Sequence, residues 1–354
     1  MMCPVTCETT NAGMGWVTDQ HKEHQRESEM LRDLGTVIIT CLLAVSLGLH
    51  HHASGDSLRQ TTRREVAVTF DDLPVVGTRD ITAQQQITRK LLRSITSNKI
   101  PAIGFVNENK LLDGGVQDER RVALLQQWLD AGLELGNHSF SHPDLHGVPL
   151  EAFQADVTRG EEVTRRLLSR RGKILRYFRH PFLHAGRDLE TRKKLEAFLA
   201  SRGYRVAPVT IDNSDWIFAS AYAKAADRAD RQMMERIASA YLPYIEEKFD
   251  YYEKQSRDLL GYEMKQVLLL HANALNADWF GELAMMMKRR GYGFIPLEQA
   301  LEDKAYSSPD TYTGTGGISW LHRWALTQGR KREFFQGEPA TPAFVMQQAG
   351  VTAE

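Results

Sequence analysis

The sequence predicts an α/β protein built on a distorted parallel (β/α) barrel of about seven strands. Short apolar strands alternate with amphipathic helices along most of the chain, a pattern typical of a mainly parallel sheet. The number of strand–helix steps fits a barrel better than an open nucleotide-binding sheet. No glycine-rich phosphate loop follows the first strand, which argues against a dinucleotide-binding fold.

The expected elements follow one another after a polar linker at 54–65. Hydrophobic periodicity and length separate short buried strands from amphipathic helices. The strands are expected at 66–70, 101–106, 133–136, 176–178, 204–210, 267–270 and 293–295. The helices are expected at 81–96, 119–131, 152–171, 189–201 and 278–290.

Two segments depart from this alternation. The stretch at about 219–264 is rich in Ala, Arg, Glu and Tyr, which predicts one or two inserted helices that pack on the barrel; a lid or dimer surface is the alternative. Past residue 301 the chain is rich in Gly, Ser, Thr and Pro, then reads GISWLHRWAL, and the last ~20 residues resemble a tail. We therefore divide the chain into a leader (1–55), a main domain (65–301) and a C-terminal extension (302–354).

Charge and cysteine content narrow the chemistry. The formal net charge is -1, from 44 Lys+Arg against 45 Asp+Glu, so we expect no nucleic-acid partner. The three cysteines are Cys3, Cys7 and Cys41, which leaves the main domain without a disulfide, a thiolate nucleophile or a cysteine metal ligand. Any metal chemistry there must use histidines and carboxylates.

The leader has the layout of a signal peptide. Residues 34–49 form an uncharged apolar run, which as a helix would rise about 24 Å, short of the roughly 30 Å hydrocarbon core. Small residues at 53–55 follow it, and Met30 offers an alternative start that gives a compact signal. We expect an exported protein, periplasmic or secreted; the alternative is an uncleaved anchor formed by residues 34–49. The membrane is then a partner only through this segment.

Polar residues stand where several predicted strands end, which is where parallel α/β proteins carry functional side chains. Asp71 and Asp72 follow the first strand. They could simply form a turn or a helix cap. His138 and His142 follow the third strand at i and i+4, a spacing that lets two imidazoles converge on a metal, although alone it is a weak signal. With a carboxylate from 71–72 they would complete an Asp-His-His site.

Three later strand ends add to this set. The stretch RYFRHPF contains Arg179, a cation that could hold a catalytic carboxylate ionised. The stretch DNSDW contributes Asp215 and Trp216. The strand LLLH delivers His271, which is either a buried structural histidine or a general acid.

These stretches together resemble the polysaccharide deacetylases of carbohydrate esterase family 4, the NodB-homology domain. Five motifs occur in the family's order over roughly 65–300: TFDD, HSFSH, RHPF, DNSDW and LLLH. The resemblance implies a distorted β/α barrel and a metal-dependent hydrolase that removes acetyl groups from an N-acetylated or O-acetylated carbohydrate. It also implies one divalent metal ion, which we expect to be zinc.

The resemblance assigns roles to individual residues. It implies Asp71 as the base that activates the attacking water, and Asp72, His138 and His142 as the metal ligands. It implies that Arg179 orients Asp71, that Asp215 tunes His271, and that His271 is the acid serving the leaving nitrogen. The Phe182 amide would be an oxyanion donor, and Trp216 and Leu269 would line the pocket around the acyl methyl group.

The sequence departs from the family pattern at three places. Phe182 stands where the family usually has tyrosine, His180 replaces the usual proline, and Ala272-Asn273 follows the last histidine instead of aspartate. None of these changes removes a catalytic group, but they put the usual substrate in doubt. A hydrolase of a small non-sugar amide and an inactive carbohydrate-binding relative therefore stay as alternatives. Nothing in the sequence indicates the oligomeric state.

Overall fold

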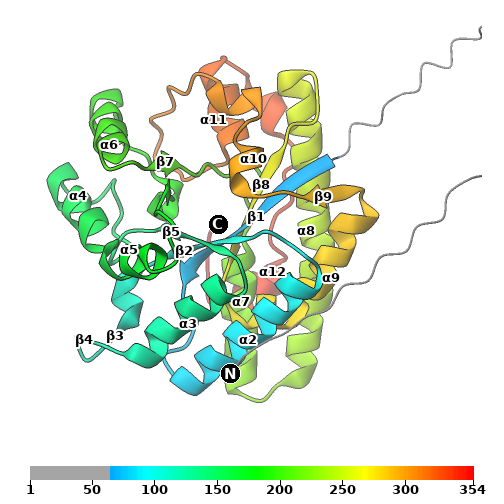
Figure 1. Ribbon diagram of the computed structural model, residues 1–354. Coiled ribbons are helices and arrows are strands. Elements are labelled where there is room, and N and C mark those ends of the chain that lie inside the picture. Colours follow the sequence, from blue (N-terminus) through cyan, green and yellow to red (C-terminus); the bar gives the residue numbers. More distant parts are fainter. Residues whose placement is uncertain (1–63) are drawn as a thin grey trace, which may run out of the picture. The chain divides into compact units, whose positions relative to one another are not determined.

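The computed structural model of the protein describes residues 64–354, and the leader expected at 1–55 lies outside the described residues. Seven parallel strands form one sheet, hydrogen-bonded in the order β7-β6-β5-β2-β1-β8, with β9 paired to β1 (Figure 1). The strands are β1 (Arg64–Leu73), β2 (Ile103–Val106), β5 (Glu134–Asn137), β6 (Tyr177–Phe178), β7 (Arg205–Val206), β8 (Gln266–His271) and β9 (Tyr292–Phe294). A separate two-stranded hairpin is formed by β3 (Leu112–Asp113) and β4 (Val116–Gln117).

The sheet curls until its two ends meet through an irregular segment. Beyond β7 the chain runs to Ile211, which bridges Leu268 of β8. The Thr210 amide donates to the Val267 carbonyl at 3.0 Å, and the Leu269 amide donates to the Ile211 carbonyl at 3.2 Å. The expectation of a distorted parallel barrel of about seven strands is confirmed.

Strand alternation divides the core into two parts and decides which side chains face the barrel interior. Val66, Val68 and Phe70 of β1 belong to the larger core under the helices, whereas Ala67 belongs to a smaller inner cluster. Because side chains alternate along a strand, Asp71 lies on the same face of β1 as Ala67. The carboxylate is thereby directed into the barrel at the end of the strand.

Helices cover the outside of the sheet (Figure 1). Most begin and end within a few residues of the expected bounds, as α2 shows, where the Asp80 carboxylate caps the first turn by accepting from the Thr82 and Ala83 amides. Helices α2 and α9 pack against each other. The barrel helices are α2 (Ile81–Ser97), α3 (Glu119–Asp130), α4 (Leu150–Arg159), α5 (Glu162–Ser169), α6 (Leu189–Ser201), α9 (Ala274–Arg289) and α10 (Leu297–Ala300).

The prediction of a single helix at 152–171 is wrong, because the structure has two helices there, α4 and α5, which are separated at Gly160. A Cβ atom on Gly160 would lie 2.4 Å from the backbone of Ser139 and Phe140. Only glycine allows this approach. The break therefore lets the helical layer approach the segment that carries His138.

The inserted segment forms two helices, α7 (Asp215–Asp227) and α8 (Arg231–Leu260), as expected. Both pack on the barrel layer, since α7 and α8 each contact α9. Tyr241 and Phe249 of α8 are fully buried. Among residues 64–354, no helix is both long and apolar enough to cross a membrane.

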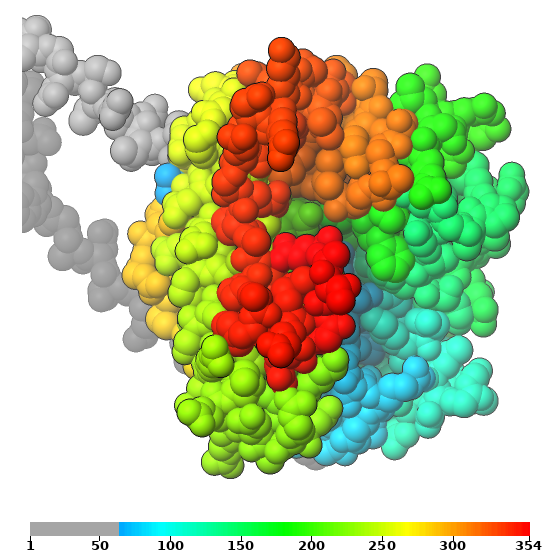
Figure 2. Space-filling view, turned by 180° about the vertical axis from the view of Figure 1, so that it is seen from behind, coloured from blue at the N-terminus to red at the C-terminus, as the bar shows by residue number. Residues whose placement is uncertain are grey.

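The C-terminal residues are ordered rather than a tail. This region holds η3 (Lys304–Ser307), α11 (Trp320–Thr327), η4 (Arg332–Phe335) and α12 (Ala343–Ala349). Helix α12 packs on α7, with Val345 fully buried, and the Lys224 ammonium donates to the Ala349 carbonyl at 2.6 Å. In Figure 2 the earlier residues of this region are orange and the last ones red, and they lie against the yellow-green α8. The expected tail is therefore wrong, and the extension is part of the folded body.

Candidate active site

The polar residues predicted at strand ends converge at the carboxyl edge of the barrel. Asp71 and Asp72 are the last polar residues of β1, and His271 ends the neighbouring β8, where it pairs in register with Asp71. His138 follows β5 and Arg179 follows β6. Parallel strands deliver their carboxyl ends to one edge, which explains why residues separated by up to 200 positions share one site.

Asp72, His138 and His142 bring one ligand atom each to within 4.8 Å of one another. The Nδ1 atom of His138 lies 2.9 Å from the Arg179 carbonyl, so this nitrogen carries the proton and Nε2 keeps its lone pair. A backbone carbonyl behind an imidazole is the support that metal-ligating histidines usually have. These three residues therefore fit a divalent metal ion.

The charge state of this trio also suits a cation. Burial raises the pKa of Asp72, but Lys110 and the nearby histidines outweigh it and hold the pKa well below its usual range. Burial lowers the pKa of His138 and of His142, which favours neutral rings. An ionised carboxylate with two neutral imidazoles is a common zinc donor set.

Backbone strain is concentrated at this edge. Among the described residues, seven non-glycine residues have positive φ angles, and five of them lie in the strand ends and loops of the site. Strained backbone of this kind is retained mainly at functional sites, where the surrounding structure enforces it. The five residues are Asp72, Ser139, His142, Phe182 and Leu183.

Asp71 is a buried carboxylate placed beside this trio. Its Oδ2 atom lies 3.7 Å from His138 Nε2 and 3.5 Å from Arg179 Nη1, while Oδ1 has no hydrogen-bond partner. Burial raises the pKa of Asp71 to about 6, although Arg179 and His271 oppose the rise. Asp71 is therefore a carboxylate that can exchange a proton near neutral pH.

Arg179 is held rigidly beneath Asp71. Its guanidinium is fully buried, donates from Nη2 to the Thr69 hydroxyl at 3.0 Å and lies over the Phe105 ring at 4.7 Å. These contacts fix the cation opposite the carboxylate.

His271, which is partly exposed, forms a tight pair with the fully buried Asp215. The His271 Nδ1 atom lies 2.6 Å from Asp215 Oδ1, and the His271 amide donates to Asp215 Oδ2 at 2.9 Å. Asn276 also donates to Oδ2, at 2.8 Å. Burial lowers the pKa of His271, but Asp215, helped by the other carboxylates, raises it to about 9. His271 therefore carries a proton at neutral pH.

The three residues expected to line the pocket differ in exposure. Phe182 is 52% exposed and packs edge-on against the His142 ring at 4.5 Å, and Trp216 is 45% exposed in the first turn of α7. Leu269 is buried on β8. Two aromatic rings thus stand at the surface near the site, whereas Leu269 as a wall of the pocket stays a prediction.

Sequence reasoning missed Lys110. Its ammonium lies 3.0 Å from Asp72 Oδ1, and it belongs to η1 (Glu108–Leu111), which follows β2. The expectation that functional side chains follow the ends of strands could have found Lys110, because β2 ends four residues before it. Lys110 offers a positive charge to the same oxygen that lies 3.9 Å from His142 Nε2.

A second missed group joins the site to the C-terminal extension. Burial raises the pKa of Asp212 to about 7, opposed by Lys248 of α8. Lys248 donates to Glu338 at 2.8 Å, and the Tyr252 hydroxyl donates to the same carboxylate at 3.0 Å. The C-terminal extension thus places the Glu338 carboxylate near Asp212 of the DNSDW stretch.

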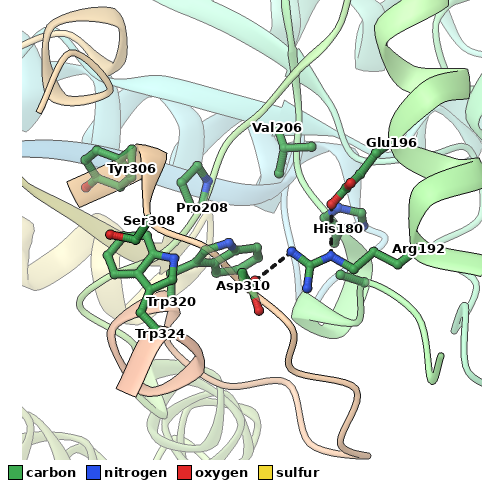
Figure 3. A pocket seen from close by; sticks show the side chains of 11 residues that line it. His180, Arg192, Glu196, Val206, Pro208, Tyr306, Ser308, Asp310, Trp320 and Trp324 are labelled. Atoms are coloured by element: carbon green, nitrogen blue, oxygen red, sulfur yellow. Dashed lines mark hydrogen bonds and ion pairs between the residues drawn. The ribbon is translucent and has the colours of Figure 1, made fainter. Parts of the chain in front are cut away.

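His180, which replaces the family's usual proline, lines a cavity to which no residue of the metal trio contributes. This cavity, of about 160 Å³, is also lined by Arg192 of α6 and by Asp310, Trp320 and Trp324 of the C-terminal extension (Figure 3). Burial, with the nearby arginines, lowers the His180 pKa to about 3. This departure therefore places His180 against the C-terminal extension.

Comparison with known proteins points to the same family as the sequence motifs. Residues 58–198 match the family model described as polysaccharide deacetylase, which is the family that the five sequence motifs resemble. A peptidoglycan-N-acetylglucosamine deacetylase of Bacillus cereus is 25% identical over 154 residues, which are 44% of this chain and 47% of that protein. The chain therefore spans about half the length of this curated relative.

Solved structures of carbohydrate esterase family 4 are also similar. A family 4 carbohydrate esterase from Streptomyces lividans in complex with acetate is 21% identical, with a TM-score of 0.42 over 67% of this chain and 95% of that one. A family 4 pseudoenzyme from Bacillus anthracis is 13% identical, with a TM-score of 0.44 over 68% of this chain and 66% of that one.

Proposed function

We propose that the protein is a metal-dependent hydrolase that removes acetyl groups from an N-acetylated or O-acetylated carbohydrate outside the cytoplasm. One observation carries the proposal: the trio Asp72, His138 and His142 shares a strand edge with a buried carboxylate, Asp71, and with the pair His271–Asp215. The match of residues 58–198 to the polysaccharide deacetylase model supports a carbohydrate substrate.

The metal would be held by Asp72, His138 and His142, and zinc is the ion that this donor set favours. When bound, such an ion acidifies water and polarises a carbonyl oxygen. The carbonyl of Arg179 behind His138 would keep the ligating nitrogen free of its proton.

The protein's own residues would then move the protons. Asp71, with a pKa near 6, takes a proton from the attacking water while the water oxygen bonds to the acetyl carbon. Arg179 keeps Asp71 oriented and favours its ionised form. The Phe182 amide would donate to the carbonyl oxygen as negative charge develops on it, a contact worth roughly 3 kcal/mol.

His271 would complete the reaction. With a pKa near 9 it holds a proton at neutral pH and gives it to the leaving nitrogen as the carbon–nitrogen bond breaks. The products are acetate and a free amine on the sugar. Asp215 stabilises the protonated ring through the 2.6 Å contact.

The substrate class rests on the pocket and on the relative. Phe182 and Trp216 present exposed aromatic faces near the site, which suits the apolar face of a sugar ring. The Bacillus cereus relative is named for the N-acetylglucosamine of peptidoglycan, which makes an N-acetylglucosamine polymer the first substrate to test. Export of the protein by its leader would bring it to such a polymer.

The test combines metal content with acetate release. Purified protein is assayed on N-acetylated glucosamine oligomers, O-acetylated xylan fragments and acetanilide, with Asp71→Asn as the matched inactive control. We expect about one zinc ion at the trio and acetate release from an acetylated glycan. Metal without release from any glycan, but with hydrolysis of acetanilide, would favour a small-amide hydrolase. Metal binding without any hydrolysis would indicate an inactive relative.

A further inference from the structure

A second group of metal-binding side chains lies beside the active site and outside all five motifs. Asp144, His146 and His184 bring one donor atom each to within 4.8 Å of one another, and they share no residue with the first trio. Asp144 and His146 lie in the loop that follows β5, and His184 lies in the loop that follows β6. The donor set is again one carboxylate and two imidazoles.

The contacts inside this group leave donor atoms available. His184 Nδ1 lies 2.6 Å from Asp144 Oδ1, so a single proton joins these two groups. His146 Nε2 accepts only a long hydrogen bond from the Gly186 amide, at 3.3 Å, and so carries a lone pair. His146 Nδ1 is buried and makes no hydrogen bond.

The two imidazole rings lie face to face. They stack in parallel, with centroids 3.9 Å apart and planes 9° apart. Because the lone pair of an imidazole lies in the plane of its ring, one of the two rings must turn about its side-chain bonds for both to bind one ion. The group combines one carboxylate with two imidazoles, and an ion held by these three ligands would keep a fourth position for solvent.

We propose that Asp144, His146 and His184 bind a second divalent metal ion of the zinc class, which ties the loop after β5 to the loop after β6. The ion would replace the proton between Asp144 and His184 as their shared positive group, and that proton would move to Nε2 of His184 or to solvent. The Asp144 side chain is 42% exposed, which gives the ion a path from solvent.

The position of this site gives it a consequence for the first. The Phe182 ring lies 4.5 Å from the His142 ring and 5.8 Å from the His184 ring, so those two imidazoles are no more than about 10 Å apart. Both loops that the ion would join carry residues of the active site, namely His142 and Phe182. A metal bound here would fix the strained backbone of Phe182, whose φ is 55°.

The experiment counts zinc ions on the full chain and its variants. Protein stripped with a chelator is loaded with Zn²⁺ alone, desalted and measured by mass spectrometry of the metal, with folding checked by circular dichroism. Cysteines and histidines before residue 64 can also bind zinc, so the difference between variants is the measured quantity. Asp130→Asn, which changes an exposed carboxylate of α3, is the control and should lose no zinc.

We expect His184→Ala and His138→Ala each to lose about one zinc ion and the double variant to lose two. Zinc should also raise the melting temperature of His138→Ala but raise that of the double variant less. The proposal would be overturned if His184→Ala and Asp144→Asn fold and keep all of their zinc. The group would then be only a hydrogen-bonded pair, Asp144 and His184, with His146 stacked on His184. Because the readout is metal bound and not acetate released, a failure of the proposed deacetylase activity would not affect this result.

Discussion

Replacing Asp215 with asparagine should remove the charge that keeps His271 protonated. The Asp215 carboxylate is fully buried, and its Oδ1 atom lies 2.6 Å from His271 Nδ1. Burial alone would lower the His271 pKa, yet Asp215 leads the contacts that raise it to about 9. Asparagine keeps the shape of the side chain and removes its charge, so the variant isolates the electrostatic effect.

The size of the effect follows from the pKa. A rise from the ordinary value of 6.5 to about 9 corresponds to about 3 kcal/mol, at roughly 1.4 kcal/mol per pKa unit. Because the pKa is higher in the folded protein, this group stabilises the fold fully below about pH 6.5, and the stabilisation is lost as the pH rises through about 9. The free energy of unfolding should therefore fall by about 3 kcal/mol between about pH 6 and pH 10, and Asp215→Asn should lack most of this fall.

Two measurements on the metal-free protein check this. Histidine resonances followed by NMR should show that His271 titrates near pH 9. In Asp215→Asn the pKa of His271 should be lower, by several tenths of a unit to a few units. Urea unfolding at three pH values should show the difference in stability, with Asp130→Asn as the exposed control. If His271 titrates at the same pH with and without the Asp215 charge, the carboxylate is not what holds its proton.

Four further outcomes are expected. Asp71→Asn should keep its metal but lose about 10²–10⁴-fold in turnover, whereas Asp72→Asn should bind metal weakly and be partly rescued by excess zinc; metal counts with the reverse pattern would exchange the two roles. His271→Ala should spare esters with good leaving groups more than amides, so an equal loss in both assays would show that it does not serve the leaving group. Lys110→Met should bind zinc about fivefold more tightly in a chelator titration, since a partly buried ion pair is worth on the order of 1 kcal/mol; unchanged affinity would mean that the ammonium does not compete for Asp72. N-terminal sequencing of the protein from its native host should find a start near residues 50–56, and an intact N-terminus in the cytoplasmic fraction would contradict export.

The sequence predicted the barrel well because its elements are short and strongly periodic. Apolar runs bounded by polar turns set the strands, and the alternation of side chains along β1 places Asp71 inside the barrel. The convergence of Asp71, His138, Arg179 and His271 follows from parallel pairing alone, since every strand delivers its carboxyl end to the same edge. The roles of these residues stay predictions that the variants above must test.

Features that depend on distant contacts could not be predicted in the same way. At Gly160 the backbone of Ser139 lies 2.4 Å from where a Cβ atom would be, which requires glycine there. A single glycine in a helical pattern does not by itself predict a break, and the approach of Ser139 is a distant contact. Helix α12 has only seven residues, too few for a clear period, and its burial depends on α7 more than 100 positions earlier.

The two Asp-His-His groups show what can be predicted from the ends of strands and what also requires the order of strands in the sheet. The first trio was found because its residues stand next to predicted strands in recognised motifs. The second pairs Asp144 with His184 across 40 positions, and only the adjacency of β5 and β6 brings their loops together. Strand order, once known, therefore converts isolated polar residues in neighbouring loops into candidate sites. In this chain the loop after β5 carries ligands for both groups, and the loop after β6 carries His184 of the second group together with Arg179 and Phe182, so the geometry of one site constrains the other.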